Sequence, residues 1–498
     1  MTCSTPPRRA SSGCGSGSLH RAMVFSSLTF VCLFLPLVGA LYLVLPRSAS
    51  NPLLVSASLV FYGWGDPGAL VLVALSVIVN FRLGLLFEAA EGSRRRRLIT
   101  AAVALNLLVL IVFKYAGFLV ENVNALAGVV SAYRLPEPRI SLPLGISFFT
   151  FHLISYLVDV FRGVVPAQRS LAAFTLYIVN FPQLIAGPII RYRQIAGQLE
   201  SRRVTFDDVD AGVARFTAGL AKKLLVANPV GAIADQVFAI PASQLSMGTA
   251  WLGVVGYTLQ IYFDFSGYSD MAIGLARLFG FRFPENFAYP YAATSMQDFW
   301  RRWHISLSSW FRDYVYIPLG GSRGSAWATV RNLWIVFLLT GVWHGASWNF
   351  IAWGMWHGLF LWIERLDRFR QAMAISPSWA RRAYVLLVVM IGWVFFRAPT
   401  LGAALEMLRR LLGGTPEAAD ALPAATYLSV PMLGLIVMAG CLAFPVWPRL
   451  RASIEQRDGG AETPGIGLAR AVLVGAAMVL ALATMAVEQH NPFIYFRF

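Results

Sequence analysis

Long apolar stretches with few or no charged residues recur along the chain and are separated by short segments that carry most of the charge. Each stretch is long enough, or nearly so, to cross about 30 Å of hydrocarbon as a helix. They lie at residues 24–45, 67–87, 98–120, 140–158, 170–190, 211–234, 246–263, 332–363, 383–396, 425–446 and 471–487, with a shorter apolar segment at 53–63. The pattern predicts roughly ten to twelve crossings and therefore an all-α polytopic membrane protein.

One uncharged stretch is too long for a single straight crossing. Residues 332–363 contain no charged side chain, and as one helix they would extend about 48 Å. The polar and small residues 344–349 near the centre predict a break in this helix. Irregular backbone at membrane depth is tolerated where protein or a water-filled cavity satisfies it, so we expect His344 to line a cavity.

The segment 295–323 differs from the spans because it mixes charged and aromatic side chains. It includes Asp298, Arg301, Arg302, His304, Arg312 and Asp313. A helix of this composition is amphipathic. We expect it to lie at the membrane interface, or to re-enter the membrane without crossing it.

The first 22 residues are rich in Ser, Gly, Pro and Arg and lack the apolar core of a signal peptide. Residues 1–22 are therefore either a disordered tail or a segment upstream of the true start, because Met23 opens the first apolar stretch. We interpret residues 23–498 as a single transmembrane domain. The side of the membrane on which the N-terminus lies depends on whether 53–63 makes a crossing of its own.

The composition excludes two other classes of protein. Of the 498 residues, 57% are apolar and only 13% are charged, against about 25% charged in soluble domains. The formal net charge of +16 would suggest nucleic acid as a partner in a soluble chain. Here the basic residues lie between the apolar stretches, chiefly at 94–97, 191–203 and 364–382. These are the expected cytoplasmic loops, facing membrane lipid and not nucleic acid.

Metal, disulfide and cofactor sites are not expected. The four cysteines lie far apart, and the six histidines show no ligand spacing. No serine-hydrolase elbow, Walker loop or dinucleotide fingerprint stands out. Hydrolysis by a catalytic triad and nucleotide-driven transport therefore have no support in the sequence.

His344 lies inside the longest uncharged stretch, where an ionisable side chain is costly and is a functional hypothesis by default. An apolar site disfavours imidazolium, so we expect a neutral base that takes a proton from a hydroxyl or thiol. The alternative is a structural histidine bonded to a neighbouring helix. His357 follows about 220° further round a continuous helix, and we interpret it as a packing residue.

His304 follows the basic pair Arg301 and Arg302. Arginines beside a histidine can bind a phosphate, carboxylate or pyrophosphate group. The alternative is an interfacial helix whose arginines contact lipid headgroups.

Two carboxylates, Asp264 and Asp270, follow the apolar stretch 246–263. Buried carboxylates need a partner, for which Arg277 and Arg282 are the candidates, and both a structural ion pair and a chemical role stay open. The candidate substrate-binding residues are Arg301, Arg302, Asp264, Asp270, Trp343 and Asn349.

Four motifs occur in order at residues 180–189 (NFPQLIAGPI), 262–270 (YFDFSGYSD), 299–307 (FWRRWHISL) and 341–345 (GVWHG). Together they resemble the membrane-bound O-acyltransferase (MBOAT) family. The opening MVFSS at 23–27 and the ending NPFIYFRF at 491–498 are similar to its AlgI-type branch, the alginate O-acetyltransferase subunits and their relatives. The first 22 residues have no counterpart in that pattern, which favours Met23 as the start.

The resemblance implies a ring of membrane helices around a funnel whose thin centre holds the active site. It implies that His344 is the essential catalytic histidine and that His304 is the second, assisting one. It also implies a multi-pass protein of the bacterial inner membrane. The donor would be an acyl thioester, carried either by coenzyme A (acetyl-CoA) or by an acyl carrier protein. The acyl group would pass to a periplasmic SGNH-like acetyltransferase that modifies an exported polysaccharide such as alginate.

The expected mechanism leaves two routes open. His344 deprotonates the accepting hydroxyl or itself accepts the acyl group, while His304 or a nearby amide stabilises the developing oxyanion. The rival hypothesis is a transporter or flippase for a lipid-linked or acidic substrate, with His344 as a proton relay and no covalent acyl transfer.

Overall fold

The computed structural model describes residues 23–129, 134–138, 140–413, 423–446 and 464–487. In these ranges the chain is helical and contains no β-strand, which confirms the predicted all-α class. The predicted tail 1–22 and the terminal motif 491–498 lie outside the described residues.

The helices of the first part are η1 (Thr29–Phe34), α2 (Leu35–Val44), α3 (Ser50–Gly65), α4 (Ala69–Glu88), α5 (Gly92–Ala127), α6 (Ile146–Phe161), α7 (Leu171–Val179), α8 (Phe181–Leu184) and α9 (Tyr192–Glu200). Those of the central part are α10 (Phe206–Ala221), η3 (Lys222–Ala227), α11 (Asn228–Ala239), α12 (Met247–Leu278), α13 (Met296–Arg302), α14 (Ile305–Phe311), η6 (Arg312–Tyr316), α15 (Ala326–His344) and α16 (Trp348–Ile363). The last part contains α17 (Asp367–Ile375), α18 (Ser378–Arg397), α19 (Leu401–Leu411), α20 (Val430–Leu442) and α22 (Pro464–Val487).

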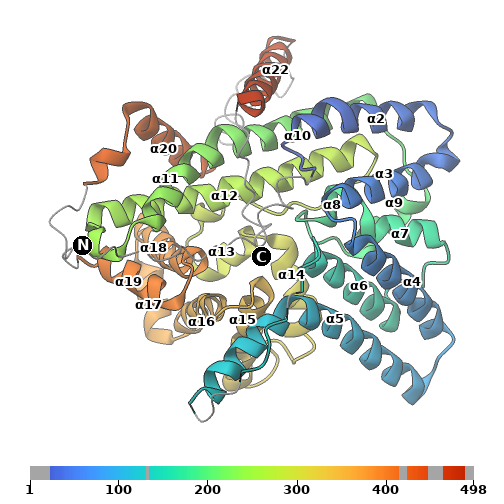
Figure 1. The fold of residues 1–498 in the computed structure, drawn as a ribbon, viewed down its shortest axis with the longest axis horizontal. Coiled ribbons are helices and arrows are strands. Elements are labelled where there is room, and N and C mark those ends of the chain that lie inside the picture. The colour runs from blue at the N-terminus through green and yellow to red at the C-terminus, as the bar shows by residue number, and fades with distance from the viewer. Residues whose placement is uncertain (1–22, 130–133, 139, 414–422, 447–463, 488–498) are drawn as a thin grey trace, which may run out of the picture.

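The short helices α13 and α14 lie near the middle of the molecule, inside the longer ones. Figure 1 shows most of α3 to α9 on one side of them and α16 to α19 on the other, while α10 and α11 follow one another along α12 above. Residues far apart in the sequence therefore meet around α13 and α14.

Five described helices are long and apolar enough to cross a membrane by length and composition: α4, α5, α15, α18 and residues Gly467–Val487 of α22. Three shorter apolar helices cover Thr29–Val44, Ile146–Phe161 and Val430–Leu442. The predicted ten to twelve crossings also counted stretches that fold into shorter or interrupted helices. The architecture is that of a polytopic membrane protein.

The centre of the bundle is α12, in which almost every residue from Thr249 to Ala276 is buried. Close packing against α10 depends on glycine, since a Cβ on Gly219 would overlap the carbonyl oxygen of Gly267. We expected a span at 246–263 that ends before the carboxylates. That boundary was wrong, because the helix continues to Leu278.

The predicted span 170–190 was also wrong as a single helix. α7 ends at Val179, the one-turn α8 follows, and the chain then runs without helix to Arg191. The protein supplies acceptors for this irregular backbone, as burial away from water requires. Phe181 N–H donates to Ser58 Oγ at 3.0 Å. The backbone N–H groups of Ile189 and Ile190 donate to the side chains of Ser306 and His152, which are described below.

The predicted break in 332–363 is confirmed. α15 ends at His344, α16 begins at Trp348, and Gly345 between them is extended. The two helices then pack tightly, because a Cβ on Gly341 would overlap the carbonyl oxygen of Phe350.

The segment 295–323 is not one amphipathic helix, contrary to expectation. It forms α13, α14 and the π-turn η6, and the chain bends between the first two at His304. This residue has φ 43° and ψ 56°, a left-handed conformation that cannot continue a right-handed helix.

Candidate active site

His344 closes α15 and is 3% exposed. Its imidazole packs against Trp343, Trp353 and Phe396, with ring centroids 4.9, 4.7 and 5.1 Å away. Trp353 belongs to α16 and Phe396 to α18. The break after His344 therefore turns its side chain into an aromatic enclosure built by three helices.

His304 is fully buried between α13 and α14. Its ring stands edge-on to Phe265 of α12, with centroids 4.7 Å apart, and Nδ1 lies 3.1 Å from Oδ1 of Asn286. The His304 ring also lies 6.4 Å from the indole of Trp343, which adjoins His344. The two histidines, forty residues apart in the sequence, thus share one aromatic neighbour.

Two residues of α5 hold the end of α15 in place. Lys114 Nζ donates to the carbonyl oxygen of Trp343 at 2.6 Å and to Ser147 Oγ at 3.2 Å. The hydroxyl of Tyr115 donates to the carbonyl oxygen of Val342. The last carbonyls of a helix have no partner within it, so these donors complete the turn that carries His344.

A cavity of about 1260 Å³ lies between α13 and α14 on one side and α15, α16 and α17 on the other. Thr340, one helical turn before His344, lines it together with Trp300 and Phe337. Neither His304 nor His344 is among its described lining residues, so the expectation that His344 lines a cavity is not met by this one. The rings of Trp300 and Trp353, 5.8 Å apart, stand between the cavity and His344.

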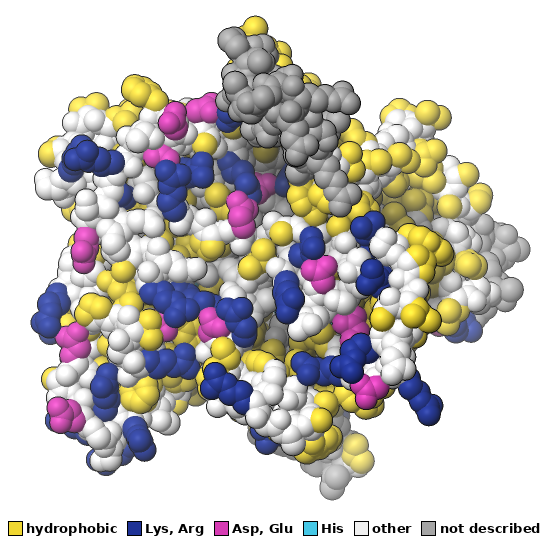
Figure 2. All heavy atoms as spheres, turned by 180° about the vertical axis from the view of Figure 1, so that it is seen from behind, with side chains coloured by type: hydrophobic (Ala, Val, Ile, Leu, Met, Phe, Trp, Pro, Cys, Tyr) yellow, Lys and Arg dark blue, Asp and Glu magenta, His cyan; other side chains and the backbone are white. Residues whose placement is uncertain are grey.

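The cavity is basic. Its arginines are Arg301, Arg312, Arg365, Arg370 and Arg381, and Glu364 is the carboxylate among its described lining residues. Figure 2 shows Lys and Arg side chains spread widely over one face of the molecule, with fewer acidic ones among them. Guanidinium groups bind phosphate and carboxylate bidentately, so the lining suits an anionic molecule.

Arg301 and Arg302, the predicted substrate-binding pair, have different surroundings in the structure. Arg301 is exposed and lines the cavity. Arg302 instead pairs with Asp298 one turn earlier, with Nε to Oδ1 at 2.8 Å. Of the two, only Arg301 faces the space where a substrate can enter.

Asp264 and Asp270 lie on α12, and the predicted arginine partners are wrong. Asp264 pairs with Lys223 at 2.6 Å, and both side chains are almost fully buried. Asp270 pairs with Arg215 at 2.7 Å and Lys222 at 2.6 Å. The π-turn η3 presents both lysines to α12, an arrangement that sequence spacing does not reveal.

Arg282, the other predicted partner, pairs with Asp208 at 2.5 Å instead. Asn349 donates its amide to the carbonyl oxygen of Ala398, which ties α16 to the end of α18. His357 is fully buried against Trp300 and Trp353, in line with its interpretation as a packing residue.

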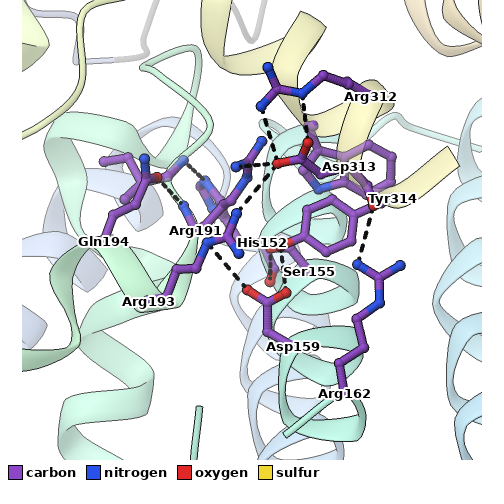
Figure 3. Close-up of polar contacts among 12 residues, drawn as sticks. His152, Ser155, Asp159, Arg162, Arg191, Arg193, Gln194, Arg312, Asp313 and Tyr314 are labelled. Atoms are coloured by element: carbon purple, nitrogen blue, oxygen red, sulfur yellow. Dashed lines mark hydrogen bonds and ion pairs between the residues drawn. The ribbon is translucent and has the colours of Figure 1, made fainter. Parts of the chain in front are cut away.

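Charged side chains join α6, the start of α9 and η6 in the cluster of Figure 3. Arg191 and Asp313 are 2.7 Å apart and mostly buried. Tyr314 donates its hydroxyl proton to Asp159 at 2.9 Å, and Arg193 lies 3.4 Å from Asp313. The cluster fixes η6, and with it the end of α14, against the first half of the chain.

Within this cluster Asp313 is held as a carboxylate. Burial by itself raises its pKa, but the hydrogen bond from Arg312 and the charges of Arg191, Arg312 and Arg193 outweigh burial and leave the pKa below its usual value.

No group of three or more His, Cys, Asp or Glu side chains in the described residues could hold a metal ion. The candidate site brings together two histidines, their aromatic neighbours and the basic cavity.

Comparison with known proteins decides the family. Residues 58–401 match the model of the MBOAT family, the membrane-bound O-acyltransferases. The chain belongs to this family. All four motifs, and with them His304 and His344, fall inside the matched region. This MBOAT chain is accordingly an O-acyltransferase and a membrane protein.

Its relatives modify several polymers. The chain is 41% identical to the probable alginate O-acetylase AlgI of Azotobacter vinelandii, over 96% of this chain and all of the relative. It is 35% identical to a peptidoglycan O-acetyltransferase of Helicobacter pylori, over 78% of this chain and 80% of the relative. A teichoic acid D-alanyltransferase of Bacillus subtilis is 30% identical over 51% of this chain and 67% of the relative. The chain is an AlgI-type MBOAT.

Sequence reasoning missed two residues of the site. Lys114 carried a signal, because it is a charged side chain within an apolar span. No signal in the sequence identified Asn286, because an asparagine in a loop after a helix is common. Its contact with His304 exists only in the folded chain.

Proposed function

We propose that this protein moves an acetyl group from a cytoplasmic thioester donor towards the hydroxyl groups of an exported polysaccharide, alginate or a related polymer. Support for the acetyl group and the polymer comes from relatives named as alginate and peptidoglycan O-acetyltransferases, similar over most of this chain. The proposed location is the bacterial inner membrane, with the arginine-rich face towards the cytoplasm.

The observation that carries the proposal is the arginine-lined cavity that ends one helical turn from His344. Coenzyme A and the phosphopantetheine arm of an acyl carrier protein both combine phosphate with a thioester at the end of a narrow chain. Arg301 and its neighbours bind the phosphate. The thioester reaches His344 when Trp300 moves aside from Trp353.

His344 is the base in the proposed reaction. It takes the proton of the accepting hydroxyl as that oxygen attacks the thioester carbonyl carbon. The new C–O bond forms, the C–S bond breaks, and the thiolate leaves with the proton that His344 carried. In the second route a ring nitrogen of His344 attacks the carbonyl carbon, the C–S bond breaks and the thiolate leaves. The accepting hydroxyl then attacks the acyl group, its proton passes to His304, and the C–N bond to His344 breaks.

The negative charge on the carbonyl oxygen requires an N–H donor during this step. The indole N–H groups of Trp343 and Trp353 are buried beside His344 and have no acceptor among the described residues. A buried donor left without an acceptor costs about 1–3 kcal/mol, which is reasonable where the acceptor is a reacting oxygen. These two groups stabilise the oxyanion.

The accepting hydroxyl belongs to a periplasmic SGNH-like acetyltransferase or to another component that modifies the polysaccharide. Either acetyl-CoA or an acyl carrier protein serves as the donor. No cofactor is bound in this scheme, because the thioester already carries the activated acyl group.

The test uses purified protein in lipid vesicles with acetyl-labelled thioesters, coenzyme A in one arm and an acyl carrier in the other. Transfer of label to an acceptor supports the proposal, and His344→Ala at equal protein level must abolish it. A flippase or transporter would leave the label on its donor. Label transfer that survives in His344→Ala would refute the role of this histidine.

A further inference from the structure

Asn286 is the residue through which the loop between α12 and α13 reaches the site. It is fully buried and lies outside all four sequence motifs. Its Nδ2 donates to Ser269 Oγ of α12 at 3.0 Å, while its Oδ1 faces His304 and Ser306. One amide side chain therefore connects the central helix to the turn that carries His304.

Three polar groups converge on Oδ1 of Asn286. They are Nδ1 of His304 at 3.1 Å, the backbone N–H of Ser306 at 3.2 Å and the hydroxyl of Ser306 at 2.8 Å. The Ser306 oxygen in turn accepts the backbone N–H of Ile189 at 2.9 Å. The Ser306 hydroxyl lies 2.8 Å from Oδ1 of Asn286 and 3.5 Å from Nδ1 of His304, so the shorter contact assigns its proton to Asn286.

The orientation of the amide follows from these contacts. The backbone N–H of Ser306 can only donate, so the atom of Asn286 that faces it must be the oxygen. An amide oxygen can only accept, and the ring nitrogen of His304 that meets the same oxygen must therefore carry a proton. Neutral His304 is thus held with its hydrogen on Nδ1 and its lone pair on Nε2.

The backbone around His304 is held just as firmly. A left-handed residue other than glycine costs of order 1–3 kcal/mol, so it persists only where its surroundings enforce it. Ile305 N–H donates to the carbonyl oxygen of Asn286 at 2.9 Å, and Ala288 N–H donates to that of Arg302 at 3.0 Å. These two bonds clamp the bend from both sides.

The backbone at Ile189 and Ile190, which contacts Ser306, is also held by His152 of α6. Nε2 of His152 on α6 accepts the backbone N–H of Ile190 at 3.1 Å, next to the Ile189 N–H that Ser306 accepts. Figure 3 shows His152 beside the charged cluster of α6 and η6. The support behind Asn286 and Ser306 thus extends into a rigid part of the bundle.

We propose that Asn286 is a positioning residue that locks the tautomer of His304, so that Nε2 is the working nitrogen and acts as a proton acceptor. This inference deepens the proposed acyl transfer and rests on it. It also assigns roles, since a neutral His304 with its only N–H given to Asn286 has no proton to donate to an oxyanion. His304 therefore takes the acceptor's proton in the route in which His344 carries the acyl group, and in the other route it orients the hydroxyl whose proton His344 takes. The oxyanion depends on other donors.

The first test reads the tautomer directly and needs no activity. Protein labelled with 15N in the histidine rings is studied by solid-state NMR in lipid, and the His304 signals are identified from their loss in His304→Gln. We expect a protonated Nδ1 and an unprotonated Nε2 in the parent protein, and a mixture of tautomers or the Nε2–H form in Asn286→Ala. A parent protein with Nε2–H, or an unchanged Nδ1–H form in Asn286→Ala, would overturn the proposal.

The second test is kinetic. We expect Asn286→Ala to lower kcat by about 10- to 100-fold with little change in KM for the donor, less than the roughly 10²–10⁴-fold effect of losing a general base. Asn286→Asp keeps an acceptor for Nδ1–H and should recover most of the activity. Asn332→Ala is the matched control, because Asn332 is equally buried but donates to Leu319 and Gly321.

A double-mutant cycle separates positioning from mere stability. If Asn286 acts through His304, the double variant Asn286→Ala, His304→Gln should be no slower than His304→Gln alone. Multiplied losses would overturn the proposal. Should Asn286→Ala fail to fold, Ser306→Ala and Asn286→Asp carry the same cycle.

The two proposals fail in different ways. Absence of label transfer by the parent protein, or retained transfer in His344→Ala, overturns the acyl-transfer proposal and leaves the NMR result standing. The wrong tautomer in an active parent protein overturns only the role of Asn286.

Discussion

The histidines of the candidate site and the carboxylates of α12 are buried to a similar degree, but they have different surroundings. His344 lies among the rings of Trp343, Trp353 and Phe396, whereas Asp264 lies 2.6 Å from Lys223. A buried charge needs a countercharge close by, and a reactive neutral base does not. The difference teaches that polar residues in this bundle have two kinds of surroundings: aromatic rings around His344, where we propose the reaction, and countercharges that join α10, η3 and α12.

The sharpest test of this division is at His344. We expect His344→Ala to lower acyl transfer by at least about 10²-fold, the lower range for a lost general base, while thermal unfolding stays close to that of the parent protein. Label transfer and the unfolding temperature in detergent measure both effects. Equal loss of stability and activity would mean that the aromatic enclosure is structural.

The opposite result is expected for the ion pair between Asp264 and Lys223. Removing one partner of a buried pair costs about 3–5 kcal/mol, because the other charge stays buried without compensation. Asp264→Asn should therefore lower the unfolding temperature strongly, while the folded fraction keeps its turnover rate.

Asp367→Asn serves as its control, since Asp367 pairs with Arg370 in an exposed position. Replacing both partners of the buried pair, as in Asp264→Leu with Lys223→Met, should restore most of the stability. Loss of turnover in folded Asp264→Asn would instead give this carboxylate a chemical role.

Substitution of Lys114 tests whether one polar residue contributes both to turnover and to the packing of the helices. Lys114→Met removes the donor to the Trp343 carbonyl, and we expect about a 10-fold loss of turnover, since the end of α15 aims His344. Tyr115→Phe removes the adjacent bond to Val342 and should cost about 0.5–1.5 kcal/mol of stability. Comparable turnover losses in both variants would show that the helix end as a whole, and not Lys114, sets the position of His344.

The smallest expected effect is at Asp313. Its pKa lies below the usual value in the folded protein, so its ion pairs stabilise the protein above about pH 4, the unfolded value. That stabilisation is lost as the pH falls through the folded pKa. Asp313→Asn should therefore unfold at a lower temperature at pH 7, and the gap should narrow as the pH falls below about 4. A gap that stays constant or widens over that fall would contradict the sign of this pKa shift.

Much of the architecture could be predicted from the order of apolar and polar residues. The break at 344–349 was visible because polar residues interrupt a stretch too long for one crossing. The division of 170–190 was not, because Phe181, Ile189 and Ile190 depend on acceptors supplied by distant residues. Hydropathy reports how apolar a segment is, and it does not report where its backbone finds partners.

The candidate site was predictable only in part. His304 and His344 stood out because polar residues are rare in apolar surroundings and because their motifs resemble a known family. The predicted partners of Asp264 and Asp270 were wrong because the π-turn η3 presents both Lys222 and Lys223 to α12, which their spacing in the sequence does not reveal.

By itself, the sequence determined the membrane class, the break after His344 and the two histidines of the candidate site. Those features follow from local composition and spacing, which require no knowledge of distant contacts. Only the tertiary structure decided that Asn286 holds Nδ1 of His304 and that Lys114 holds the end of α15. Hydrogen bonds between segments far apart in the chain depend on how the helices pack, and packing brings together residues that no local pattern connects.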